Sequence, residues 1–126
     1  MKFVLLLFTI SFILFFSGCK EDMEIEENIT FSRTYGSSTY EEGHDVRQTD
    51  DSGYIVVGQT MINYERDVWL FKANEYGELL WERTFGGDLT DTGESIEPTT
   101  DGGYIIVAST DWNIWLIKTD ENGIEE

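Results

Sequence analysis

Short apolar stretches separated by polar turns recur along the chain after residue 28, and their spacing is typical of β-strands. The segments YIVV (54–57) and YIIVA (104–108) are rich in β-branched residues, and each follows an Asp-Ser-Gly or Asp-Gly-Gly turn. No window of useful length beyond residue 20 shows helical periodicity. The pattern predicts an all-β chain with strands at about 43–49, 54–60, 67–73 and 78–85, followed by strands at about 93–99, 103–110 and 113–119.

These predicted strands belong to an internal repeat. Residues 33–60 align on 83–110 at an offset of 50, and WLFKANEYG (69–77) aligns on WLIKTDENG (115–123) at an offset of 46. Periods of about 20–50 residues are typical of solenoids, propellers and arrays, and four strands in about 40–50 residues is the size of a propeller blade. We therefore expect about two four-stranded antiparallel propeller-type blades in a repeat region spanning 29–126, with repeats at about 33–82 and 83–126.

Three segments of the repeat also carry a resemblance to a known family. WERTFGG, DGGYIIVAST and WLIKTDENG resemble the bacterial and archaeal beta-propeller repeat family called SBBP. The resemblance covers nearly all of residues 30–126. It implies an extracytoplasmic propeller, and it implies no catalytic residue, because that family has no established common chemistry.

Two blades form only a partial propeller. Residues 29–35 (ITFSRTY) match the predicted outer strand at 80–85 (LWERTF), so the chain begins with an outer strand and ends on a blade that lacks one. The end faces would expose apolar strand surfaces, which favours association. Three explanations stay open: a truncated member of a longer family, several chains sharing one ring, or two units folded on each other as a small sandwich or barrel.

The N-terminus has the pattern of an export signal. Lys2 precedes an apolar stretch from Phe3 to Phe16, which is shorter than the ~20 residues that span a bilayer. Phe16-Ser17-Gly18-Cys19 then resembles a lipobox, the bacterial lipoprotein signal. The resemblance implies a signal peptide at 1–18 and lipidation of Cys19, the only cysteine. A plain secretory signal with an incidental cysteine is the alternative. Two or three acyl chains anchor a protein firmly.

Charge distinguishes the segment that follows and limits the possible partners. Residues 19–28 would form an acidic tether, and its Lys20-Glu21-Asp22 resembles an export signal of some surface lipoproteins. We therefore expect a cell-envelope protein held to the membrane through Cys19. The formal net charge is −17, with 25 acidic and 8 basic residues, so nucleic acid is not an expected partner.

Candidate catalytic and metal-binding residues are sparse. His44 is the only histidine, no nucleophile motif accompanies it, and the repeat has Glu94 at that position. We predict no catalytic residues, no metal site and no cofactor. The acids lie at turns and in the tether, and TDDSG (49–53) and TDENG (119–123) do not continue as calcium loops. Trp69, Trp81 and Trp115 occupy strand positions of the repeat typical of a core, whereas Trp112 lies in a loop.

The sequence leaves several functions open. The first is a non-enzymatic binding or scaffold module, with a protein partner or self-association through exposed blade faces. The second is a scaffold for outer-membrane barrel assembly, because NEYGELLW (74–81) loosely resembles a docking pattern of such lipoproteins. A carbohydrate-binding or glycan-hydrolysing protein is a third, although the mannose-site pattern of bulb-type lectins is absent. A gene remnant without function of its own is the fourth.

Overall fold

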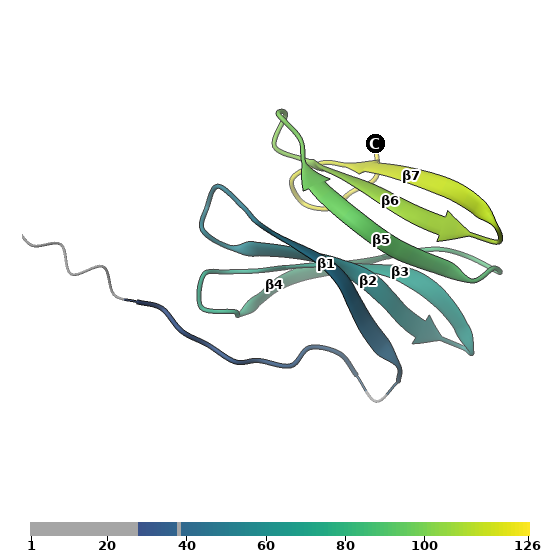
Figure 1. The fold of residues 1–126 in the computed structure, drawn as a ribbon, viewed down its shortest axis with the longest axis horizontal. Helices are drawn as coiled ribbons and strands as arrows, with labels where there is room; N and C mark the ends of the chain where they lie inside the picture. Colours follow the sequence, from purple (N-terminus) through teal and green to yellow (C-terminus); the bar gives the residue numbers. More distant parts are fainter. Residues whose placement is uncertain (1–27, 38) are drawn as a thin grey trace, which may run out of the picture.

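The computed structural model describes residues 28–37 and 39–126, and these residues form two antiparallel β-sheets (Figure 1). The predicted signal peptide at 1–18 and Cys19, together with the tether up to residue 27, lie outside the described residues. Seven strands follow in chain order: β1 (Glu41–Gln48), β2 (Tyr54–Ile62), β3 (Glu65–Ala73), β4 (Leu79–Phe85), β5 (Asp91–Pro98), β6 (Tyr104–Thr110) and β7 (Asn113–Thr119).

Each repeat folds as one sheet in which neighbouring strands in the sequence are neighbours in space. The first sheet has the order β1-β2-β3-β4 and the second has the order β5-β6-β7, with antiparallel pairing throughout. The prediction of an all-β fold is confirmed for the described residues, and every strand lies within two residues of its expected bounds. The second sheet has three strands, whereas about two four-stranded blades were expected. The two sheets do not close into a barrel or a propeller.

The core lies between the two sheets. β5 packs against β1, β2 and β3, so the second sheet covers one face of the first sheet (Figure 1). The buried cluster takes alternate residues from facing strands, as expected where side chains alternate between sheet faces. Its members are Ile55, Val57, Val68, Leu70, Ile96, Tyr104, Ile106, Ala108 and Ile117. Polar groups also join the sheets: the Asp45 carboxylate accepts hydrogen bonds from the Ile96 amide at 2.9 Å and the Ser95 hydroxyl at 3.0 Å.

The Asp-x-Gly turns that start β2 and β6 have a shared physical role. In the first sheet, Asp51 accepts hydrogen bonds from the Thr49 hydroxyl and the Gly53 amide and pairs with Lys72 on β3. In the second sheet, Asp101 makes the equivalent contacts with Thr99, Gly103 and Lys118. Each turn therefore ties the end of one hairpin to the neighbouring strand, which is why the repeat preserves these residue types.

Residues 29–35, which the sequence predicts as an outer strand, belong to no strand of the structure. They run across the face of the first sheet that points away from the second sheet (Figure 1). The Phe31 ring packs on the Tyr54 ring with 5.7 Å between ring centres, and the Tyr35 ring packs on the Phe71 ring with 4.6 Å between ring centres. The Tyr35 hydroxyl donates to the Gly77 carbonyl at 2.7 Å. This N-terminal segment is therefore held by packing and hydrogen bonds without a ladder partner of its own.

Candidate functional site

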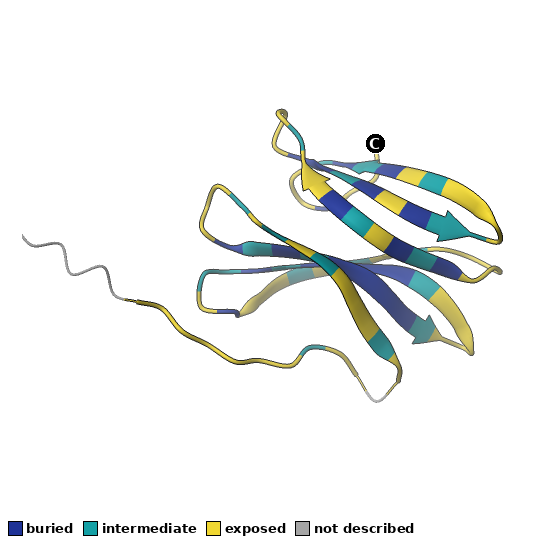
Figure 2. Ribbon diagram, in the orientation of Figure 1, coloured by how far each residue is buried: buried dark blue, intermediate teal, exposed yellow. Residues whose placement is uncertain are grey.

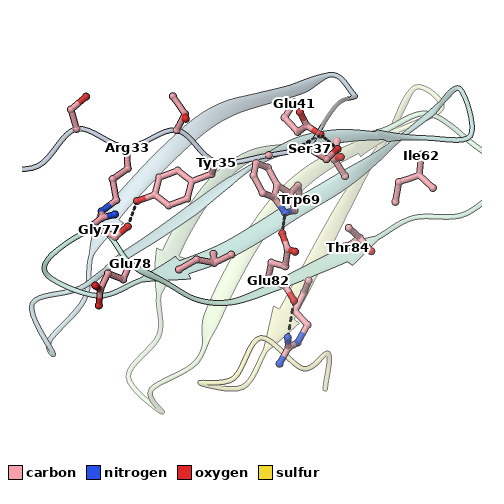
Figure 3. Close-up of a pocket in the computed structure, with 16 residues that line it drawn as sticks. Arg33, Tyr35, Ser37, Glu41, Ile62, Trp69, Gly77, Glu78, Glu82 and Thr84 are labelled. Carbon is pink, nitrogen blue, oxygen red and sulfur yellow. Dashed lines mark hydrogen bonds between the residues drawn. The ribbon is translucent and has the colours of Figure 1, made fainter.

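A groove lies between the N-terminal segment and the first sheet. It encloses about 1010 Å³, and Figure 3 shows Trp69 on its floor, with Tyr35 and Glu82 beside it. The Trp69 indole N–H donates to the Glu82 carboxylate at 2.9 Å. Trp69 stacks obliquely on Phe71 at 4.7 Å between ring centres. The groove thus combines an aromatic floor with a polar rim.

The rim of this groove is held in place by short-range hydrogen bonds. Glu41 accepts from the Thr39 hydroxyl at 2.7 Å and from the Ser37 hydroxyl at 2.9 Å. These hydrogen bonds, led by that of Thr39, hold the pKa of Glu41 below its usual range. On the other side, the Arg33 guanidinium donates to the Tyr76 carbonyl at 2.9 Å. The N-terminal segment is therefore fixed to the first sheet at both ends of the groove (Figure 3).

A second surface lies on the opposite end of the molecule, on the outer face of the second sheet. Val107, Ile114 and Leu116 are 41%, 85% and 63% exposed there. Their repeat-equivalent residues in the first sheet, Val57, Val68 and Leu70, are all 0% exposed because the second sheet covers them. Figure 2 shows this change as exposed positions along β6 and β7. The same apolar pattern is therefore buried in one sheet and uncovered in the other.

An acidic pair lies where β3 begins and the loop after β4 leads into β5. Asp91 is buried, and one carboxylate oxygen each of Asp67 and Asp91 has no hydrogen-bond partner among the described residues. Both side chains border Gly86, since a β-carbon placed there would lie 2.0 Å from Asp67 Oδ1 and 2.9 Å from Asp91 Oδ2. Burial and the neighbouring charges of Asp91 and Glu65 raise the pKa of Asp67.

His44, weighed in the sequence as a possible base, holds the two sheets together. It is the extra residue of a β-bulge between Gly43 and Asp45, and Glu94 occupies the same bulge in β5. Its Nδ1 lies 2.7 Å from the Gly93 carbonyl oxygen of the second sheet. Its Nε2 lies 3.6 Å from Glu42. The structure therefore places His44 in an inter-sheet contact.

The tryptophans divide between core and surface, as their repeat positions suggest. Trp69 is buried, and Trp81 and Trp115 pack against the core cluster. Trp112 is fully exposed at the tip of the β6–β7 hairpin, with a positive φ of 73°. At the corresponding tip of the β2–β3 hairpin, Tyr64 is also almost fully exposed. Cys19, the predicted lipidation site, lies outside the described residues.

Sequence reasoning missed two features that the structure brings together. The first is the groove, because it arises from contacts of the N-terminal segment with residues far along the chain, such as that of Tyr35 with Gly77, 42 positions away. The second is the Asp67–Asp91 pair, because both residues are acids at strand ends and read as ordinary turn positions. Their repeat partners are Asn113 and Glu41, so the repeat gives no signal for the pair either.

Metal and membrane features add little to this picture. Within 28–37 and 39–126, no three or more His, Cys, Asp or Glu side chains gather as a metal site would require. Over the same stretches, the fold contains no helix with the length and apolar character needed to cross a bilayer.

No known family model matches the chain, and no curated protein matches it. The fold thus defines a protein of two stacked, repeat-related antiparallel sheets.

Proposed function

We propose that this protein is a lipid-anchored module of the cell envelope, built from propeller-type repeats, that binds or organises other proteins without catalysing a reaction. The observation that carries the interaction role is the uncovered apolar face of the second sheet, formed by Val107, Ile114 and Leu116. Contiguous exposed apolar surface on a folded domain is typical of protein interaction sites. Because the repeat-equivalent residues of the first sheet are buried, this face has the composition of an interior surface.

The anchor rests on the sequence alone. Phe16-Ser17-Gly18-Cys19 closes an apolar stretch, and the acidic residues that follow would hold the repeat region away from a negatively charged membrane surface. An interaction module fixed at the membrane finds its partners within a thin layer, which raises their effective concentration. Display on the outer membrane of a Gram-negative cell is the location that fits Lys20-Glu21-Asp22.

Metabolic labelling with palmitate tests the anchor. The unaltered chain is expected to incorporate the label and to sediment with membranes, whereas Cys19→Ala is expected to lose the label and to appear in the soluble extracytoplasmic fraction. The matched control is Ser17→Ala, which keeps a small residue before the cysteine and should keep the label. Unlabelled protein with an intact Cys19 would overturn the lipid anchor.

One observation favours a second function. Asp91, which is buried, and Asp67, which is half-buried, form an acidic pair of the kind that a glycan hydrolase would need, and the exposed Trp112 offers an aromatic face for a sugar. The pair borders a loop and the groove does not include it. Hydrolysis of a polysaccharide that is abolished by Asp91→Asn would establish this activity in place of the binding role.

A further inference from the structure

The N-terminal segment stands against the first sheet as β4 stands against the second. Phe31 packs on Tyr54 at 5.7 Å between ring centres, and Trp81 packs on Tyr104 at 6.3 Å. A β-carbon on Gly77 would meet Phe31 and Arg33, and one on Gly123 would meet Trp81 and Arg83. Phe31 and Tyr54 are the repeat equivalents of Trp81 and Tyr104 at an offset of 50, and Gly77 is the equivalent of Gly123 at an offset of 46. The N-terminal segment therefore occupies the place of a β4 strand that belongs to a sheet preceding the first one.

The second sheet lacks a fourth strand beside β7 among the described residues. β4 pairs with β3 along Lys72↔Trp81, Leu70↔Arg83 and Val68↔Phe85. In the second sheet, Glu125 bridges to Thr119 and the Glu126 amide donates to the Lys118 carbonyl at 3.1 Å. These two contacts correspond to the first positions of β4. Beyond them, no strand among the described residues pairs with the free edge of β7.

The missing positions match the N-terminal segment residue for residue. Glu126 stands where Leu80 stands in the first repeat, and Phe31 is the repeat equivalent of Trp81. Phe31 to Tyr35 would therefore continue the strand that Glu125 and Glu126 begin. The expected pairs are Lys118↔Phe31, Leu116↔Arg33 and Ile114↔Tyr35. The segment lies on the far face of the first sheet from β7 of its own chain, so a different molecule must supply it (Figure 1).

From this we infer that the partner of the second sheet is a second copy of this chain, whose residues 31–35 complete the sheet at β7. The first sheet of that copy then lies against the outer face of the second sheet. This inference deepens the proposed binding role and rests on it, because it names the occupant of the apolar face. The lipid anchor plays no part in it.

The two surfaces that meet are chemically matched. Trp69 forms the floor of the groove beside the N-terminal segment. Trp115, the repeat equivalent of Trp69, packs against the cluster that contains Val68 and Leu70. The exposed equivalents of those two residues are Ile114 and Leu116. In the assembly, the side chains of Ile114 and Leu116 would enter the groove of the next copy. The contact would thus bury two features that an isolated chain leaves open.

Charge agrees with the same arrangement. Between the sheets of one chain, the Arg47 guanidinium binds the Glu97 carboxylate at 2.8 Å. These two residues are also repeat equivalents of each other. Stacking a second copy therefore places Glu97 of one copy opposite Arg47 of the next, so opposite charges alternate along the stack. A like-charged pair at this position would have opposed the contact.

The contact joins two different surfaces, so copies add head to tail. Every copy has both of its surfaces covered only when the array closes into a ring. Propeller-type sheets stack around a common axis with about four to eight blades. Two, three or four copies of this two-sheet chain would supply such a number. We therefore expect a ring of defined size.

Cross-linking between two single-cysteine-added variants tests the register. Full-length protein with Arg33→Cys is mixed in detergent with full-length protein carrying Leu116→Cys, and a short bismaleimide is added. Mass spectrometry is expected to find a peptide joining positions 33 and 116. Thr34→Cys, one residue out of register and on the other side of the strand, is the matched control and should cross-link to Leu116→Cys at least about tenfold less. Equal yields for both pairs would overturn the register.

Light scattering on the full-length chain in detergent tests the assembly. The protein mass, corrected for bound detergent, is expected to be a defined multiple of the mass of one chain. Leu116→Asp should raise the concentration needed for association at least about tenfold, because it places a charge in the buried contact. Leu89→Asp, at a similarly exposed leucine outside the contact, should leave the mass unchanged.

Each other outcome overturns a stated part of the inference. A monomer at every concentration would overturn the second copy as the partner of β7. Aggregates without a defined size would exclude the ring, and an assembly unaffected by Leu116→Asp would exclude this face as the contact. The cross-link is identified by the peptide that joins positions 33 and 116, and association is tested by Leu116→Asp, so both readouts are separate from the acyl labelling of Cys19.

Discussion

Leu70 provides the sharpest test of how the two sheets stack. It lies on β3, is 0% exposed and belongs to the cluster that the second sheet covers. Replacing a buried leucine by alanine removes apolar contacts and leaves a cavity, which together cost about 2–5 kcal/mol. A domain of about a hundred ordered residues has a free energy of unfolding of about 5–15 kcal/mol. Leu70→Ala should therefore remove a large share of the stability.

The repeat supplies a matched control for this substitution. Leu116 occupies the equivalent position on β7 and is 63% exposed in the isolated chain. Only about a third of its side chain is buried, so Leu116→Ala should cost less than about 1 kcal/mol where the chain is monomeric. The two substitutions are chemically identical, and they differ only in whether a second sheet lies over the leucine.

Urea unfolding followed by tryptophan fluorescence measures both costs, since Trp69, Trp81 and Trp115 report on the packed sheets. The measurement is made at a protein concentration at which light scattering gives a monomer. A cost below about 1 kcal/mol for Leu70→Ala would refute the stacking of the second sheet on β3. Equal costs for the two substitutions in the monomer would refute the difference in burial between the faces.

Three further predictions concern the turns and the acidic pair. Gly103→Ala should cost about 1–3 kcal/mol in urea unfolding, because its β-carbon would lie 2.0 Å from a backbone carbonyl oxygen, whereas Gly87→Ala, with open space around it, should change stability by less than about 0.5 kcal/mol. Asp67→Asn should stabilise the protein more at pH 7 than at pH 3.5. The pKa of Asp67 is raised in the folded state, so the stability that the protonated carboxyl contributes is present at low pH and is lost as the carboxyl ionises. An equal change in stability at both pH values would contradict this. The hydrogen bonds from Lys72 and Thr49 lower the pKa of Asp51 to about 2. The stability that the Asp51 carboxylate contributes is therefore present above the ordinary aspartate pKa of about 4 and is lost as the pH falls toward 2. Asp51→Asn should reduce the dependence of the melting temperature on pH over that range, and an unchanged dependence would exclude the contribution.

Much of the fold was predictable because the information is local. The alternation of side chains and the turn residues at Asp51 and Asp101 define the strands, and each strand then pairs with its neighbour in the sequence. Hairpins of this kind need only short loops, so the meander order follows from the strand bounds. The internal repeat adds that both halves fold alike, which the equal bulges at His44 and Glu94 show in detail.

The candidate surfaces were less predictable because they depend on contacts between distant residues. The sequence predicts that apolar blade faces are exposed, but it does not distinguish Leu70 from Leu116, which occupy the same position in the repeat. Only the stacking order decides that one is buried and the other exposed. The groove likewise exists because the N-terminal segment lies against the first sheet, which brings Tyr35 to Gly77 across 42 positions of the chain.

Local sequence patterns were enough to predict the all-β class of the described residues and the bounds of the seven strands to within two residues, but they wrongly predicted a strand at 29–35. The tertiary structure was needed to show which face of each sheet is covered, that His44 joins the sheets, and that Asp67 lies beside the buried Asp91. The physical reason is that strand formation and turn geometry depend on residues close in the chain, whereas burial and the pKa shifts that follow from it depend on which sheet lies above which.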